Sequence, residues 1–157
     1  MHTSETSIAV GCDEAAFHLK ETLRAHLEKL GHTVKDYGVY NTEPSLYPNI
    51  ALQVSSAVVE GKHEQAILMC GTGIGMAITA NKVPGIRAAV CHDVYSTERA
   101  RKSNDCQVMA LGARVVGEEY AKSLVDAWLK SDFEGGKSAA KVERIKEIEQ
   151  EFINPKK

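Results

Sequence analysis

Short apolar runs alternate along the chain with longer segments in which apolar residues recur every three or four positions. The runs span four to six residues and indicate buried strands, at positions 7–11, 34–37, 66–69, 86–91 and 108–111. The longer segments indicate amphipathic helices, at positions 14–30, 50–59, 94–103 and 117–129, with a further helix ending at position 82. Strands that alternate with helices form repeated βαβ units. The pattern therefore predicts an α/β fold, namely a doubly wound, Rossmann-like, five-stranded parallel sheet with helices on both faces.

The end of the chain adds a charged helical tail to this sheet. Its apolar positions recur at helical spacing between positions 138 and 152, and they are Val142, Ile145, Ile148 and Phe152. A stripe this narrow suits packing against a partner subunit, and packing against the chain's own domain explains it equally well. We expect residues 134–157 to form a tail helix that reaches a partner.

Length and composition indicate one domain spanning residues 1–157, whose polar first six residues we expect to be disordered. A net charge of −2 and a pI near 6.3 give no general attraction to nucleic acid or to a membrane surface. We therefore expect a small-molecule ligand. Apolar runs stay far below the roughly 20 residues of a spanning helix, and the N-terminus lacks the pattern of a signal peptide. A cytoplasmic location is expected.

The four cysteines lack the spacing of a metal site or of a disulfide framework. We therefore expect no structural metal site and no disulfide framework among them. Cys12, Cys91 and Cys106 lie at the ends of apolar runs, where a free cysteine usually behaves as a small buried apolar residue. Cys70 differs because glycines follow it.

Three glycines at alternate positions, Gly71, Gly73 and Gly75, follow Cys70 between a strand and a helix. Glycines let backbone amides converge at a helix N-terminus, where they bind an anion or a developing oxyanion. A dinucleotide fingerprint would need glycine where Met76 stands, and no Gly-Lys-Ser/Thr closes a P-loop. The loop therefore predicts a nest for negative charge beside a cysteine whose thiolate removes a proton or attacks carbon.

In a parallel sheet, ligands bind beyond the carboxyl ends of the strands. The residues expected there, besides the glycine loop, are Asp13, Glu14, His92, Asp93 and the segment 112–114. Asp13 suits a helix N-cap and sugar-hydroxyl binding equally. His92 is either a functional imidazole or a structural residue. Lys137 and Lys141 share one helix face, which either is solvated or binds a phosphate.

A set of specific motifs matches a known family from Ile8 to about Glu149. The motifs are Gly11-Cys12-Asp13, Tyr47-Pro48, Cys70-Gly71-Thr72-Gly73-Ile74-Gly75, Ala80-Asn81-Lys82-Val83-Pro84-Gly85-Ile86-Arg87-Ala88, Ser103-Asn104-Asp105 and Gly112-Ala113-Arg114-Val115-Val116-Gly117. Through them the chain resembles the ribose-5-phosphate isomerase B family, which includes the subunits of galactose-6-phosphate isomerase.

The resemblance implies interconversion of a phosphorylated aldose and ketose through a cis-enediolate, with no metal and no cofactor. It implies a homodimer, or a dimer of dimers, with active sites at the subunit interface. Cys70 is similar to the family's base, and the loop amides to its enediolate hole, which Gly71, Gly73, Ile74 and Gly75 would form. The other positions that match the family's site are Asp13, Thr72, Tyr47, Asn81 and Asn104 around the sugar and Arg114 at the phosphate.

Departures from the family pattern concern the substrate. Ser103 replaces the histidine credited with opening the sugar ring, Glu14 replaces a histidine, and Lys137 and Lys141 replace arginines. Glu14 would repel the phosphate if it faced it. Two explanations stay open for Ser103: either His92 has taken over the acid–base role, or the substrate is a tetrose 4-phosphate, which cannot close a furanose ring.

The segment His92 to Ala100 also resembles the erythrulose-4-phosphate isomerase branch of the family. Ribose 5-phosphate and a tetrose phosphate are therefore both candidate substrates. A third possibility is a non-catalytic sugar-phosphate-binding subunit of a paired isomerase, against which the retained Cys70 and the complete glycine loop argue.

Overall fold

Five parallel strands form the centre of the fold in the computed structural model, which describes residues 7–156. The expectation for residues 1–6 lies outside this described part. The strands are β1 Ser7–Cys12, β2 Thr33–Asp36, β3 Gln65–Cys70, β4 Ala88–Val90 and β5 Val108–Gly112. Their order across the sheet is β2-β1-β3-β5-β4, and every neighbouring pair is parallel. The predicted fold class is confirmed.

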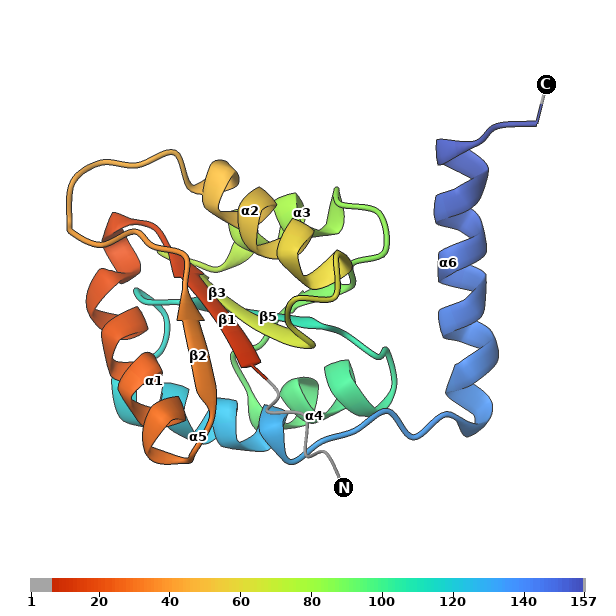
Figure 1. Ribbon diagram of the computed structural model, residues 1–157. Coiled ribbons are helices and arrows are strands. Elements are labelled where there is room, and N and C mark those ends of the chain that lie inside the picture. Colours follow the sequence, from red (N-terminus) through yellow and green to blue (C-terminus); the bar gives the residue numbers. More distant parts are fainter. Residues whose placement is uncertain (1–6, 157) are drawn as a thin grey trace.

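Helices cover both faces of this sheet (Figure 1). One face packs against α1 Phe17–Lys29, α4 Val94–Lys102 and α5 Glu118–Leu129, and its apolar cluster contains the fully buried Trp128. The other face packs against α2 Tyr47–Val59 and α3 Ile74–Asn81. Because both faces are covered, the central strands β1 and β3 carry only apolar residues and glycine after their first residue, which is why they appear as continuous runs rather than as alternating patterns.

Several boundaries differ from those expected. Helix α2 begins at Tyr47, three residues before position 50, because Pro48 is accepted in the first helical turn, where its missing N–H costs nothing. The segment 14–30 divides into a 3₁₀ turn, Glu14–Ala16, and the helix α1. Strand β4 is three residues long, shorter than the run 86–91.

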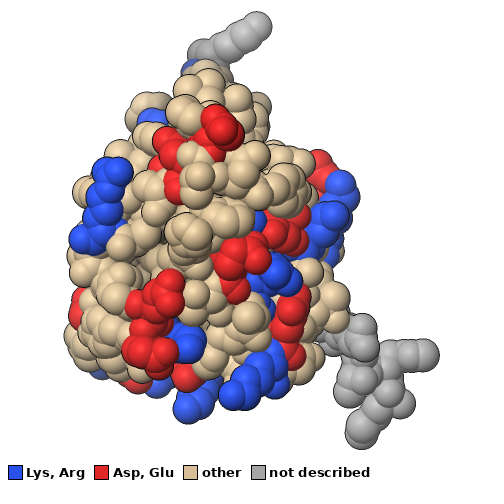
Figure 2. Space-filling model, turned by 90° about the vertical axis from the view of Figure 1, so that its left-hand side faces the viewer, with Lys and Arg blue, Asp and Glu red and all other residues tan. Residues whose placement is uncertain are grey.

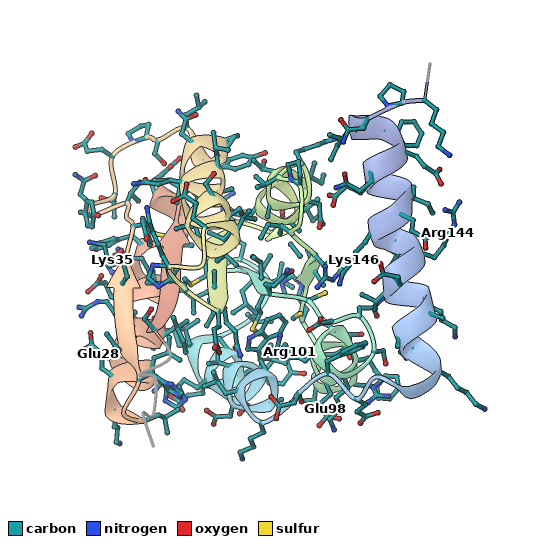
Figure 3. All side chains as sticks on the ribbon, turned by 45° about the vertical axis from the view of Figure 1, so that its right-hand side comes forward. Glu28, Lys35, Glu98, Arg101, Arg144 and Lys146 are labelled. Atoms are coloured by element: carbon teal, nitrogen blue, oxygen red, sulfur yellow. The ribbon has the colours of Figure 1, made fainter. Side chains whose placement is uncertain are left out.

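The tail helix α6, Ala139–Ile153, stands beside the sheet domain rather than on it (Figure 1). A 3₁₀ turn, Gly136–Ser138, precedes it. Val142 is buried, whereas the rest of its apolar stripe is exposed: Ile145 by 45%, Ile148 by 42% and Phe152 by 84%. In Figure 3, Lys146 points from α6 toward the sheet domain and Arg144 points away from it. The stripe is therefore mostly uncovered by the chain itself.

Charges are mixed on the surface. On the face drawn in Figure 2, basic and acidic side chains lie interspersed among neutral ones. Within residues 7–156, no helix has both the length and the apolar character needed to cross a membrane.

A buried cation holds the connection that follows β2. Lys20 is fully buried in α1, and its Nζ lies 2.7 Å from Asp36 Oδ2 and donates to the Val39 carbonyl oxygen at 2.6 Å. The rings of Phe17 and Tyr40 lie 5.4 and 5.2 Å from the same nitrogen. A buried charge is tolerated only with such partners, so Lys20 joins α1 to the end of β2 and to the loop behind it.

We expect Lys20→Ala to lower the free energy of unfolding by about 3 kcal/mol, because it leaves the Asp36 carboxylate and the Val39 carbonyl without their partner. Urea unfolding of the variant measures this. Lys29→Ala, on an exposed position of the same helix, is the matched control and should change the value little. Equal losses in the two variants would contradict the role given to Lys20.

Candidate functional site

Sequence-predicted residues from several strands meet at the carboxyl edge of the sheet. The last residue of β3, Cys70, pairs with Gly112, the last residue of β5. Asp13 follows β1, and its backbone N–H donates to the Met69 carbonyl oxygen at 3.1 Å. His92 lies two residues after the end of β4, and its ring accepts a hydrogen bond from the Gly112 N–H. The edge therefore brings a carboxylate, a thiol and an imidazole to one end of the sheet.

The loop after β3 is shaped around the sulfur of Cys70. The backbone N–H of Gly73 donates to Cys70 Sγ at 3.1 Å, and Cys70 is 5% exposed. Gly73 is the N-cap of α3 with φ of 77°, in the left-handed region that glycine adopts without strain. A side chain there would also meet the backbone of Leu111 at 3.0 Å. This loop geometry thus places an amide donor on the thiol.

A second amide of the loop, at the start of α3, donates to a side chain of the loop itself. The Ile74 N–H donates to Thr72 Oγ1 at 3.2 Å, while the first-turn amides of a helix have no acceptor inside the helix itself. The first turn of α3 therefore supplies donors for negative charge beside the sulfur. Thr72 is exposed and Gly71 is partly exposed.

Tyr47 closes over this loop from α2. A Cβ atom at position 75 would overlap the Tyr47 hydroxyl and ring, so Gly75 is required where α2 crosses the start of α3. The early start of α2 is what brings Tyr47 here. The phenol thereby forms one wall of the region around Cys70.

Arg114 supplies the positive charge at this edge. Its backbone N–H donates to the Gly71 carbonyl oxygen at 3.0 Å. The guanidinium nitrogen Nη1 lies 3.3 Å from the place where a Gly71 side chain would begin, so the group lies over the glycine loop. Arg114 is exposed and is free to meet an anion at the loop.

The two acidic residues after β1 have different surroundings. Asp13 Oδ1 accepts from the Ala16 N–H at 3.1 Å and caps the 3₁₀ turn, and burial raises the pKa of its carboxyl group. Glu14 accepts instead from Ser45, and the Ser45 hydroxyl is the main cause that holds the pKa of Glu14 below its ordinary value. Asp13 thus caps the 3₁₀ turn, and Glu14 accepts hydrogen bonds from Ser45 in the loop that precedes α2.

His92 is held as a neutral ring by the backbone. The Gly112 N–H donates to His92 Nε2 at 2.9 Å. A backbone amide can only donate, so Nε2 is the unprotonated nitrogen and the proton sits on Nδ1. Burial lowers the pKa of His92, which also favours the neutral ring, while the charge of the nearby Asp93 raises that pKa.

The structure separates five other predicted residues from this edge. The Asn81 side chain pairs with the backbone of Ala88, the first residue of β4, at 2.8 and 2.9 Å. The Asn104 carbonyl accepts from Arg87, which precedes the same strand, and Ser103 is the C-cap of α4. These residues lie at the amino edge of the sheet. Lys137 and Lys141 lie in the tail, on the turn before α6 and on α6 itself.

The remaining cysteines are buried, as expected. Burial raises the pKa of Cys12 and of Cys91 to about 12 and that of Cys106 to about 11. In the described part of the chain, histidine, cysteine, aspartate and glutamate side chains do not gather in threes as metal ligands do.

Two residues of the site were not predicted from the sequence. Ser45 bonds Glu14 across 31 positions, and Lys20 anchors the loop that contains Ser45. Neither belongs to a motif. A lysine among the apolar positions of an amphipathic helix was the one signal available for Lys20, since burying it demands a partner.

The comparisons with known proteins identify the family of this chain. The family model described as Ribose/Galactose Isomerase matches residues 8–145. The chain is 57% identical over 140 residues to the D-erythrulose-4-phosphate isomerase of Pectobacterium atrosepticum, covering 88% of this chain and 92% of that protein. It is 49% identical over 143 residues to the ribose-5-phosphate isomerase B of Escherichia coli, covering 91% and 96%.

A solved structure extends the likeness to the fold. The ribose-5-phosphate isomerase B of Clostridium thermocellum superimposes with a TM-score of 0.92 at 44% identity, covering 94% of this chain and 99% of that chain. Because the family model spans most of the sequence and the relatives match over nearly their full lengths, this chain belongs to the ribose/galactose isomerase family.

Proposed function

We propose that the chain is an aldose–ketose isomerase that acts on a phosphorylated sugar. The observation that carries this function is the contact between Cys70 Sγ and the Gly73 amide at the carboxyl edge of the sheet. This contact places a backbone N–H donor directly on the sulfur that acts as the base in the proposed reaction.

The reaction is a proton transfer between neighbouring carbons. The Cys70 thiolate removes the proton from the hydroxyl-bearing carbon next to the carbonyl, whose oxygen becomes negative as a cis-enediolate forms. The Gly73 N–H is engaged by Cys70 Sγ and the Ile74 N–H by Thr72 Oγ1, so the amides of Gly71 and Gly75 are the loop donors assigned to that oxygen. The thiol then returns the proton to the former carbonyl carbon, and a hydroxyl proton moves between the two oxygens. The substrate is isomerised without an external oxidant, so the chemistry requires no cofactor.

We further propose that two copies of the chain build each active site. Asn81, Ser103 and Asn104 lie at the sheet edge opposite to Cys70, so a partner must supply them if they contact the same substrate. The exposed stripe of α6 supports the same arrangement, because an uncovered apolar helix face suits packing on another subunit.

The lysines of the tail fit this dimer. Lys137 and Lys141 are exposed and stand apart from the loop that Arg114 covers. In a homodimer they would approach the partner's site, where a phosphate needs positive charge in addition to one guanidinium. We propose that Arg114 and these lysines bind the phosphate, and that the dimer works in the cytoplasm, where free thiols persist.

A tetrose phosphate is the substrate that we favour over ribose 5-phosphate, because of His92. Ring opening needs a group that both accepts and donates protons. The Gly112 amide occupies His92 Nε2, and the other nitrogen already carries its proton, so the imidazole has no free acceptor. With Ser103 in place of a histidine, the site lacks a ring opener. An open-chain tetrose 4-phosphate needs none.

We expect Cys70→Ser to lower kcat by a factor of about 10² to 10⁴ while the fold persists, because the proton-transfer group is lost. Steady-state kinetics and circular dichroism measure the two quantities. Cys106→Ala, which removes a buried thiol at the amino edge, is the control and should keep kcat within about twofold. Near-normal turnover of Cys70→Ser would remove Cys70 as the base.

The shared site predicts complementation between two inactive variants. In a mixed dimer of Cys70→Ala and Asn104→Ala, one of the two sites keeps both residues, and mixed dimers make up half of a random population. Co-expression should therefore restore about a quarter of the normal activity. Co-expression of Cys70→Ala with a chain that carries both Cys70→Ala and Asn104→Ala should restore no activity. No recovery in the first pairing would mean that each chain holds its own complete site.

The substrate is tested by comparing kcat/KM for erythrose 4-phosphate, ribose 5-phosphate and allose 6-phosphate. We expect the tetrose to be preferred by at least about tenfold. Ser103→His should raise the ribose 5-phosphate value, and His92→Asn should affect the tetrose and the pentose equally. A selective loss of pentose activity in His92→Asn would instead make His92 the ring opener. Inactivity of the unaltered protein on all three sugars would favour a binding subunit.

A further inference from the structure

We propose that Glu14 is a positioning residue that latches the loop of residues 37–46 and thereby holds Tyr47 over the catalytic loop. Its effect on turnover rests on the proposed function, whereas the latch itself does not. From the sequence, Glu14 was expected among the substrate-binding residues, whereas in the structure its carboxylate binds Ser45 of the same chain.

The latch consists of two hydrogen bonds to one carboxylate oxygen. Glu14 Oε2 accepts from the Ser45 hydroxyl at 2.7 Å and from the Ser45 backbone N–H at 3.1 Å. Both donors favour the ionised carboxylate, and Arg114 adds a weaker attraction. The contact joins the end of β1 to a loop 31 positions away.

The loop depends on polar contacts for its position. Residues 40–44 are all exposed, so apolar packing contributes little to holding them. Lys20 fixes the start of the loop at the Val39 carbonyl oxygen, and Asn41 Oδ1 closes a local turn by accepting from the Glu43 N–H at 3.0 Å. Ser45, which is partly buried, is the point at which the far end of the loop is attached to the sheet domain.

The attached end leads directly into the active site. Two residues after Ser45, Tyr47 begins α2, and its phenol occupies the space above Gly75. Release of Ser45 would free the first turn of α2 to move away from the loop that holds the enediolate. Small displacements of a positioning group reduce catalysis strongly. Glu14 therefore acts on the reaction through Ser45 and Tyr47.

Hydrogen exchange and kinetics of Glu14→Ala, Ser45→Ala and the double variant test the latch, with Glu43→Ala as the control from the same loop. In the free protein, exchange of the hydrogen-bonded amides of Val39, residue 43 and residue 45 should become several-fold faster in the three latch variants and stay unchanged in Glu43→Ala. Unchanged exchange of β1 and β3 will show that the fold is intact. Equal exchange in all four variants would overturn the latch.

The kinetic test separates positioning from substrate contact. We expect either single variant to lower kcat about tenfold with KM changed by no more than about twofold, and the double variant to be no worse than either single variant. Glu14→Gln, which keeps an acceptor for Ser45, should recover part of the loss. A raised KM in Glu14→Ala alone, with additive effects, would make Glu14 a substrate ligand instead. If the unaltered protein isomerises no sugar phosphate, the proposed function fails while the exchange result still decides the latch.

Discussion

All five strands run in the same direction, and this constraint decides where the chemistry can lie. Every strand ends at one edge, and every following helix returns the chain to the other. The loop after β3, the residues after β1 and the imidazole after β4 are therefore neighbours although they are far apart in sequence. The same constraint carries the ends of α3 and α4 to the opposite edge, where Asn81, Ser103 and Asn104 lie.

The architecture could be predicted from the sequence because it depends on the distribution of apolar residues. Strands buried on both faces leave continuous apolar runs, and the amphipathic helices between them leave a period of three to four. The strand order could not be predicted, since it depends on which runs pack together in space. Nor did periodicity place the start of α2 at Tyr47, because a proline in the first turn interrupts the pattern without ending the helix.

The candidate site was predictable as far as local motifs reach. Cys70 and its glycines form one continuous segment, and their amide-to-sulfur contact spans three positions. Contacts between segments that are distant in sequence correspond to no local motif. The tautomer of His92 depends on one amide in β5, and the engagement of Glu14 depends on a serine in a surface loop. A charge at the end of a strand therefore suggested ligand binding, where the structure shows a contact within the protein.

Three of the four cysteines are set apart from Cys70 by their place in the fold, which has a consequence for covalent inhibition. Cys12, Cys91 and Cys106 are buried with pKa values raised to about 12, 12 and 11, so their thiols stay protonated near neutral pH and react poorly with electrophiles. Cys70 is the cysteine that must ionise in the proposed reaction. An alkylating reagent shaped like a small phosphorylated sugar and bound in the proposed site would therefore meet one sulfur that the reaction requires as a thiolate.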